Sequence, residues 1–508
     1  MPGEVTVAEL LRHHSKLRGS HPLLICDQDR ISYAEADYQS AELARGLIAL
    51  GAGKGTHVGL LYPNGTEFVV GMLAAARIGA VVIPVSTFVT ARELREQLVD
   101  SDTEILLAAP SFRSHDYVQR LTEVLSEADF DSRLFCAAAP QLRHVAITHE
   151  PVYRRADTID RELRRVIEDD VAGCDVLAIV YTSGSTAAPK GVVHTHAALL
   201  EHQRNLNAIR GLTESDRLFC NSPFFWIGGF AFGLLATIVA GSTLVCSNAT
   251  DAGATLDLLE AEKPTMANGF AAGVVGLAEH PSFAGRDLSS MRRGNLYPIM
   301  AADARPADPE LRHNMLGMTE AGSVLLLSAD ESDQPESRRG SFGKPAPGFE
   351  TMIVDGELRI RGPYVMQRYH KRSREECFDA DGWFHTGDLV HTDAEGFVYF
   401  DGRRSAMIKS AGANVSPPEV EKAIARVTGG MAAYVVGIPD SKRGQLVAAV
   451  VAMPDGAAFD EAAVREGLKA ELSAYKIPHR FVAVPSAELP LLSSGKVDAQ
   501  RLKELFDA

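Results

Sequence analysis

A hydroxyl-rich turn that ends in a lysine is the first stretch of this sequence whose residue types suggest chemistry. The segment YTSGSTAAPKGVVHTH, residues 181–196, follows the apolar run VLAIV. A strand that ends in Gly, Ser and Thr exposes backbone N–H groups and hydroxyls at one point, and Lys190 adds a compact cation. The segment could therefore hold a polyphosphate. It lacks the GxxxxGK pattern of a Walker loop, and such turns after strands are often only turns, so it does not decide the matter alone.

Five further segments follow this turn in a fixed order. They are GMTE (317–320), GWFHTGDLV (382–390), DGRRSAMIKSAGANVSPPEVE (401–421), YKIP (475–478) and PLLSSGKVDAQRL (490–502). In order and spacing the six segments resemble the adenylate-forming superfamily of acyl-CoA synthetases, peptide-synthetase adenylation domains and firefly luciferase. The resemblance covers nearly the whole chain. It implies a large and a small domain that enclose ATP and a carboxylic acid, form an acyl-adenylate, release pyrophosphate and pass the acyl group to a thiol.

The resemblance also assigns residues to the adenylation step. A carboxylate is a poor electrophile, and AMP gives it a good leaving group, but cations must screen the two anions as they approach. Thr319 would contact the α-phosphate, Glu320 would bind Mg²⁺, and Lys496 would bridge the acid and the α-phosphate. The loop for the β- and γ-phosphates would comprise Thr182, Ser183, Gly184, Ser185, Thr186 and Lys190. The ribose and adenine contacts would come from Asp388, Arg403, Leu316 and Gly317.

The thiol step would use a loop of the C-terminal domain. By resemblance, KSAGANVSP with Lys409 and Gly412 lines a narrow tunnel for the pantetheine arm of coenzyme A, and Gly412 leaves room for the thiol. A glycine there can equally be a turn former. Trp226 falls where many relatives carry an aromatic gate between tunnel and acyl pocket, although a core role is nearly as good an interpretation.

The acyl pocket would be apolar. Relatives that activate amino acids place an Asp near FFWIGGF, and this chain has only aromatic and small residues there, so an amino acid substrate is unexpected. Small and apolar linings suit a bulky hydrophobic acid, whether aliphatic, polycyclic or aryl. The residues expected to line the pocket are Trp226, Gly228, Gly229, Phe230, Gly269, Phe270 and Asn295.

Several positions depart from the family pattern. Ala187 replaces a loop glycine, Leu316 replaces the aromatic residue that stacks on adenine, and Ser405 replaces an Asp or Lys at the hinge. RRGNLYPI (292–299) stands where relatives read close to SGGAPL. Three hypotheses follow: a complete ligase using ATP, Mg²⁺ and CoA; a partial enzyme with weakened adenylation, or a ligase serving a carrier protein; and an adenylate-binding pseudoenzyme.

The elements that must position these residues form an α/β fold. Helical patterns such as YAEADYQSAELARGLIAL alternate with short apolar strands, which indicates mostly parallel sheets wrapped by helices. From about residue 340 the pattern changes to short strands and turns. We predict a large domain over 1–402, with a β-rich subdomain at about 340–402, and a small mobile α+β domain over 403–508.

The composition of the chain limits the kinds of molecule that it is expected to bind. The chain has 508 residues and a net charge of −15, which disfavours nucleic acid as a partner. Six scattered cysteines suggest reduced thiols, and the absence of a secretory signal makes the cytoplasm the expected location. GGFAFGLLATIVAGSTLVCSNAT reads as a helix followed by a strand, not as a membrane span. His194 and His196 lack a further ligand and are expected to be structural, and an oligomer is compatible with the sequence.

Overall fold

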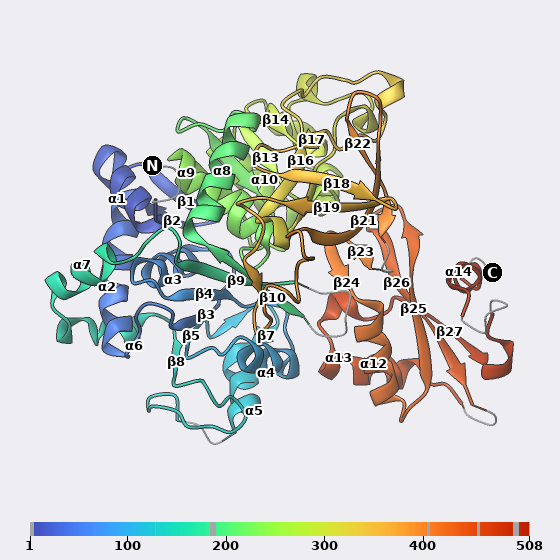
Figure 1. Cartoon of the computed structure of the whole chain (residues 1–508), viewed down its shortest axis with the longest axis horizontal. Coiled ribbons are helices and arrows are strands. Elements are labelled where there is room, and N and C mark those ends of the chain that lie inside the picture. The colour runs from blue at the N-terminus through green and yellow to red at the C-terminus, as the bar shows by residue number, and fades with distance from the viewer. Residues whose placement is uncertain are drawn as a thin grey trace. The chain divides into compact units, whose positions relative to one another are not determined.

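The computed structural model describes residues 5–126, 129–182, 189–403, 407–454, 458–490 and 497–506 (Figure 1). The chain divides into two compact units. Unit 1 takes in Met1–Thr87, Leu98–Tyr181 and Gly191–Gly402. Unit 2 takes in Phe88–Gln97, Thr182–Lys190 and Arg403–Ala508.

Two largely parallel sheets form the centre of unit 1, as the alternating sequence pattern predicts. One has the strand order β20-β10-β9-β4-β3-β5-β8 and the other β14-β13-β11-β12-β1-β2. The edge pairs β10·β20 and β1·β2 are antiparallel. The strands of the first sheet are β3 (His57–Leu61), β4 (Val81–Pro84), β5 (Ile105–Ala108), β8 (His144–Ile147), β9 (Val176–Thr182), β10 (Lys190–Thr195) and β20 (Arg368–Tyr369). Those of the second are β1 (Pro22–Cys26), β2 (Asp29–Ser32), β11 (Arg217–Cys220), β12 (Thr243–Cys246), β13 (Met266–Asn268) and β14 (Arg293–Gly294).

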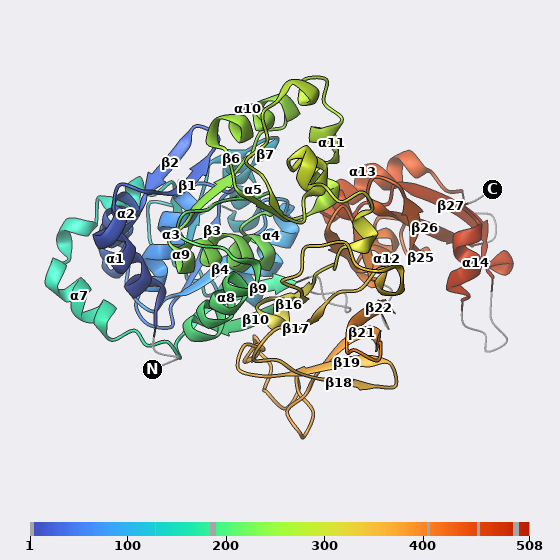
Figure 2. The same ribbon diagram turned by 90° about the horizontal axis from the view of Figure 1, so that it is seen from above.

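Helices connect these strands, and their ends carry recognisable sequence signals. Capping boxes begin the first two helices: Thr6 with Glu9, and Ser32 with Glu35. Figure 2 shows α1, α2 and α3 side by side. The helices up to residue 278 are α1 (Val7–Arg18), α2 (Tyr33–Ala49), α3 (Thr66–Arg77), α4 (Ala91–Asp100), α5 (Tyr117–Leu125), α6 (Glu150–Tyr153), α7 (Arg161–Asp169), α8 (His196–Arg210), α9 (Ala236–Ala240), α10 (Ala252–Glu262) and α11 (Val275–Ala278).

The long uncharged stretch after Trp226 is a helix followed by a strand, as expected. Its first part is a π-helix, η2 (Gly228–Leu235), which runs into α9, and β12 follows. None of the helices in the described ranges combines the length and apolar character that a bilayer-spanning helix needs. π-helical turns are rare and often occur at functional sites, and this one coincides with the expected acyl pocket.

Short antiparallel strands make up the rest of unit 1. A three-stranded sheet joins β15 (Leu316–Met318), β16 (Ser323–Leu327) and β17 (Lys344–Pro345). A four-stranded sheet contains β18 (Glu350–Val354), β19 (Glu357–Arg361), β21 (Phe384–Thr392) and β22 (Val398–Arg403), and Figure 2 shows it as one layer. A hairpin pairs β6 (Ser111–Phe112) with β7 (His115–Asp116).

Unit 2 contains a sheet with helices. Its strand order is β24-β23-β26-β25, and β27 pairs in parallel with β26. The strands are β23 (Ile408–Ser410), β24 (Ala413–Val415), β25 (Ala432–Asp440), β26 (Gly444–Met453) and β27 (Arg480–Pro485), and the helices include α12 (Pro417–Val427), α13 (Glu461–Glu471) and α14 (Ala499–Glu504). Side chains from this sheet, α12 and α13 share a buried apolar cluster. The α/β fold class with a large first and a small second domain is confirmed.

Candidate functional site

The turn after β15 holds the two residues expected at the α-phosphate and the metal. Thr319 and Glu320 open a short 3₁₀ turn, η8 (Thr319–Ala321). The hydroxyl of Tyr369 donates to Glu320 Oε1 at 2.7 Å, and the N–H of Met366 donates to the Glu320 carbonyl at 2.8 Å. Tyr369 lies on β20, whose neighbour is β10. The Glu320 carboxylate is thus held at one oxygen by a side chain that lies 49 residues further along the chain.

Two asparagines fix the backbone of the expected acyl pocket. Asn221 accepts from the Phe270 N–H and donates to its carbonyl, both at 2.9 Å. Asn295 does the same for Gly269, accepting at 3.1 Å and donating at 2.8 Å. Gly269 has φ +147°, and a Cβ there would lie 1.9 Å from Asn221 Oδ1. Only glycine fits at this position.

The backbone held by these two asparagines carries Phe270, whose ring contacts that of Trp226. The Phe270 and Trp226 rings meet edge to face, with centroids 5.5 Å apart and an angle of 85°. Gly228 and Gly229 begin η2, and a Cβ on Gly229 would lie 2.1 Å from the Pro223 carbonyl oxygen. The structure brings together Trp226, Gly269, Phe270 and Asn295. Phe230, also expected in the pocket, is fully buried and its ring lies near that of Phe68.

Two of the residues expected at the nucleotide, Asp388 and Leu316, are buried, whereas Gly317 is exposed. Asp388 is 0% exposed, and its backbone N–H donates to Thr386 Oγ1 at 3.1 Å. Leu316 is 2% exposed and belongs to a buried apolar cluster. Gly317 needs its small size because a Cβ would lie 2.8 Å from the Ser323 carbonyl oxygen.

Other expected site residues lie in unit 2 or outside the described residues. Gly412 connects β23 to β24 with φ +86°, and Lys409 is exposed on β23. Thr182 ends β9 and Lys190 begins β10. Ser183, Gly184, Ser185, Thr186 and Lys496 lie outside the described residues, as do Ala187, Ser405 and the side chain of Arg403.

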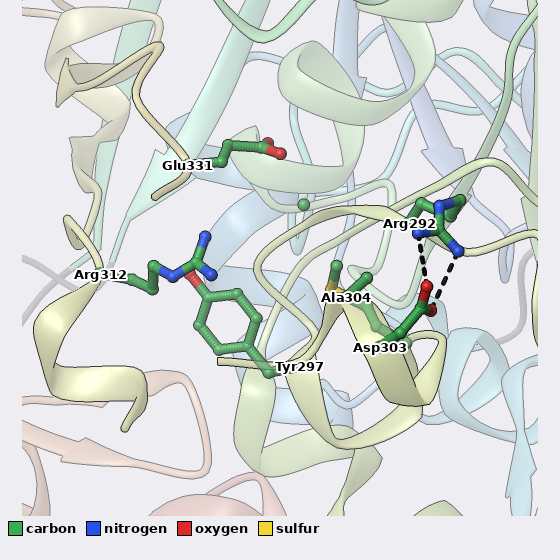
Figure 3. A pocket seen from close by; sticks show the side chains of 8 residues that line it. Arg292, Tyr297, Asp303, Ala304, Arg312 and Glu331 are labelled. Carbon is green, nitrogen blue, oxygen red and sulfur yellow. Dashed lines mark hydrogen bonds and ion pairs between the residues drawn. The ribbon is translucent and has the colours of Figure 1, made fainter. Parts of the chain in front are cut away.

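A polar cavity of about 230 Å³ lies beside the segment that departs from the family pattern at 292–299 (Figure 3). Arg292 and Asp303 form a two-bond ion pair on one side, at 3.0 and 2.9 Å. Figure 3 shows the Arg312 guanidinium beside the Tyr297 ring, with Glu331 nearby. Burial raises the pKa of the Glu331 carboxyl and of the Tyr297 hydroxyl. The remaining lining residues are Gly294, Met300 and Ala304.

Tyr369 and Asn221 were not expected at the site from the sequence, nor were the cavity residues that follow position 299. Tyr369 follows Glu320 by 49 positions in a segment without a distinctive pattern, and Asn221 looks like an ordinary residue after a strand. The side-chain pairings depend on which strand edges the fold brings together. The only local signal is Gly269, because a glycine directly after a strand often marks a close backbone approach.

Buried histidines make the fold sensitive to acid. Desolvation lowers the pKa of His149, His194, His196 and His202 to about 4. An unfolded histidine titrates near pH 6.5, so between about pH 6.5 and 4 the unfolded chain binds protons that the folded chain does not. Within this range, each such histidine therefore lowers the free energy of unfolding by about 1.4 kcal/mol for every pH unit by which the pH falls.

We therefore expect urea unfolding to show a steep loss of stability between pH 6.5 and 5. The control is His149→Leu, which removes one such group. The slope of its free energy of unfolding against pH should be smaller by the equivalent of about one bound proton. A free energy of unfolding that stays constant over this pH range, or an unchanged slope in the variant, would contradict the prediction.

Comparison with known proteins gives the family. Residues 11–370 match the family described as AMP-binding enzyme, and residues 419–496 match the AMP-binding enzyme C-terminal domain. A putative acyl-CoA synthetase, YngI of Bacillus subtilis (strain 168), is 30% identical over 94% of this chain and 92% of its own. A substituted octahydro-indenyl propanoyl:CoA ligase of Mycobacterium tuberculosis is 32% identical over 96% of each chain. The structure of o-succinylbenzoate CoA synthetase (MenE) from Bacillus subtilis has a TM-score of 0.76 at 24% identity and covers 99% of both chains.

Proposed function

Because this chain belongs to the AMP-binding enzyme family and is an AMP-forming acid–thiol ligase of the acyl-CoA ligase type, we propose that it activates a bulky hydrophobic carboxylic acid and transfers the acyl group to CoA. The observation that carries the choice of acid is the Trp226–Phe270 wall beside Gly228 and Gly229. Apolar and aromatic walls favour an apolar acyl group. The octahydro-indenyl acid named for one relative is of the same class.

The carboxylate of Glu320 suits a hard cation such as Mg²⁺. A carboxylate and phosphate oxygens are the ligands that Mg²⁺ prefers, and in the described ranges no group of three His, Cys, Asp or Glu forms a metal site of its own. Glu320 would therefore hold the ion together with the nucleotide. Bound there, Mg²⁺ would screen negative charge on the phosphates. Tyr369 donates to one carboxylate oxygen and so orients the group.

The remaining assignments follow the family pattern. We propose Lys190 and the 182–186 segment for the β- and γ-phosphates, Thr319 for the α-phosphate, and Asp388 with Arg403 for the ribose. Lys496 would place its cation between the carboxylate and the α-phosphate, where two anions must approach each other. Gly412 and Lys409 would border the path of the thiol, and Leu316 and Gly317 would lie near the base.

A panel of acids tests the proposal. Each acid is incubated with ATP, Mg²⁺ and either CoA or an acyl carrier protein, and products are identified by mass spectrometry. We expect acyl-CoA from polycyclic or aryl acids and none from amino acids. Thioester on the carrier protein alone would identify a carrier-protein ligase, and adenylate or thioester from none of the acids would contradict the proposal.

A second candidate is a partial enzyme with weakened adenylation. It is favoured by Ala187, Leu316 and Ser405, which fall on elements that relatives use for ATP or domain movement, and by the altered segment at 292–299. The thiol-side loop around Gly412 follows the family pattern closely. Any impairment should therefore affect adenylation more than thioester formation.

We accordingly expect the protein to convert a synthetic acyl-AMP plus CoA to thioester faster than it converts the free acid with ATP and CoA. Loss of one well-placed phosphate contact lowers a rate by about a hundredfold, so the difference should be easily measured. Thioester and pyrophosphate are followed in parallel from both starting points. Equal rates, with pyrophosphate released in step with thioester, would leave an ordinary two-step ligase.

A further inference from the structure

The turn from Thr319 to Val324 has an unusual backbone. Gly322 has φ +68° and the next residue, Ser323, has φ +146°. Residues other than glycine rarely adopt such angles, and they persist only where the surroundings hold them. Ser323 is 2% exposed. Something in the interior must therefore fix this turn.

Three buried side chains donate hydrogen bonds to its carbonyl groups. His194 Nε2 donates to Thr319 at 2.7 Å, Gln203 Nε2 to Gly322 at 3.3 Å, and His202 Nε2 to Val324 at 2.8 Å. All three donors are 0% exposed. His194 is on β10 and the other two are on α8, the helix that follows it. We call His194, His202 and Gln203 the donor row.

Burial of the donor row is energetically unfavourable, because each of its side chains also has a polar atom without a hydrogen-bond partner among the described residues. Within the described part of the chain, His194 Nδ1, His202 Nδ1 and Gln203 Oε1 have no hydrogen-bond partner. Leaving a buried polar atom unpaired is unfavourable. The His202 ring is also fixed, because it stacks on Tyr364 at 5.3 Å and meets Phe349 edge on at 5.1 Å. Unpaired polar atoms in a protein interior commonly mark functional sites.

We propose that the donor row is a positioning set: it fixes the strained turn from Thr319 to Val324 and so aims Thr319 and Glu320 at the nucleotide. The consequence for catalysis rests on the proposed function, whereas the hold on the turn does not. Met366 and Tyr369 in addition hold Glu320 by its carbonyl and its carboxylate. The turn is thus held from the interior by the donor row and at Glu320 by the segment that includes β20. A displacement of about 1 Å at a reacting group can cost about a hundredfold in rate.

Two substitutions of His194 distinguish loss of the hydrogen-bond donor from an unspecific loss of stability. His194→Leu removes the donor, and His194→Gln retains an amide donor near the position of Nε2. His149→Leu is the matched control, because His149 is also buried, its pKa is likewise lowered to about 4, and no described contact joins it to the turn. Backbone hydrogen exchange of the 319–324 peptide and the kcat and KM of adenylation for ATP are measured for each, together with thermal unfolding.

We expect His194→Leu to speed exchange in this peptide by about tenfold or more, and to lower kcat/KM for adenylation by about ten- to a hundredfold. In His194→Gln, the exchange rate and the kcat/KM should stay close to those of the parent. His149→Leu should change neither quantity, although it should shift the temperature of unfolding by a similar amount to His194→Leu. Gln203→Leu should reproduce the faster exchange if His194→Leu fails to fold.

Unchanged exchange in His194→Leu or, if it fails to fold, in Gln203→Leu, or the same loss in His194→Gln as in His194→Leu, would overturn the inference. Faster exchange with unchanged adenylation would overturn the positioning role while leaving the acyl-CoA ligase proposal intact. If the parent shows no ligase activity, the proposed function fails, and exchange alone still decides whether the donor row holds the turn.

Discussion

Replacement of Lys496 by Ala is expected to lower acyl-adenylate formation by about a hundredfold to a thousandfold. Transfer from a supplied acyl-AMP to CoA should change by no more than about threefold, because the adenylate is then already formed and no second anion has to approach. Lys496 belongs to the PLLSSGKVDAQRL segment. Its proposed role is to place a cation between the carboxylate and the α-phosphate as the new bond forms.

The two half-reactions can be measured separately. Pyrophosphate release from acid and ATP reports adenylation, and thioester formed from synthetic acyl-AMP reports transfer. Lys469→Ala is the matched control, since Lys469 is an exposed lysine of unit 2 on α13 that pairs only with Glu466 in its described contacts. Lys496→Arg adds a test of geometry, because a planar guanidinium does not replace a point-like ammonium at a narrow site. Equal losses in both half-reactions would remove Lys496 from the adenylation step.

Much of the fold could be predicted because hydrophobic periodicity is a local property. The apolar runs at β3, β4, β5 and β9 and the amphipathic pattern of α2 each identify an element without knowledge of the rest of the chain. The same holds for β25, β26 and α13 in unit 2. A π-helix at 228–235 could not be predicted in this way, because its glycines and apolar residues are equally compatible with an α-helix.

At the candidate site, the sequence drew attention mainly to residues that belong to short motifs of neighbouring positions. Thr319 and Glu320 stand together, and so do Gly269 and Phe270. The partners that hold them are distant: Tyr369 for Glu320, and Asn221 for Phe270. His194 was expected to be only structural, and its bond to the Thr319 carbonyl arises because the fold brings β10 into contact with the turn that follows β15. Pairings of this kind depend on tertiary contacts and leave no periodic signal.

Replacement of Gly412 by Leu is expected to suppress thioester formation by about a hundredfold or more while adenylation stays near the parental rate. The side chain would enter the space proposed for the pantetheine arm, which the acid and ATP do not use. Gly412 has φ +86°, so any L-residue there also strains the β23–β24 connection. Such strain lowers the stability of the protein by about 1–2 kcal/mol. Its effect on activity must be distinguished from obstruction of the thiol path by the side chain.

Gly429→Leu provides that separation. Gly429 also lies in unit 2 with positive φ, +70°, and no atom lies within 4 Å of the position that a Cβ would take. It follows α12, outside the proposed thiol path, so the two variants should lose similar stability while only Gly412→Leu loses thioester formation. Acyl-AMP formation, acyl-CoA formation and thermal unfolding are measured for both. If Gly412→Leu forms thioester at the parental rate, or if Gly429→Leu loses as much, the thiol does not approach along this loop and the β23–β24 glycine is only a turn former.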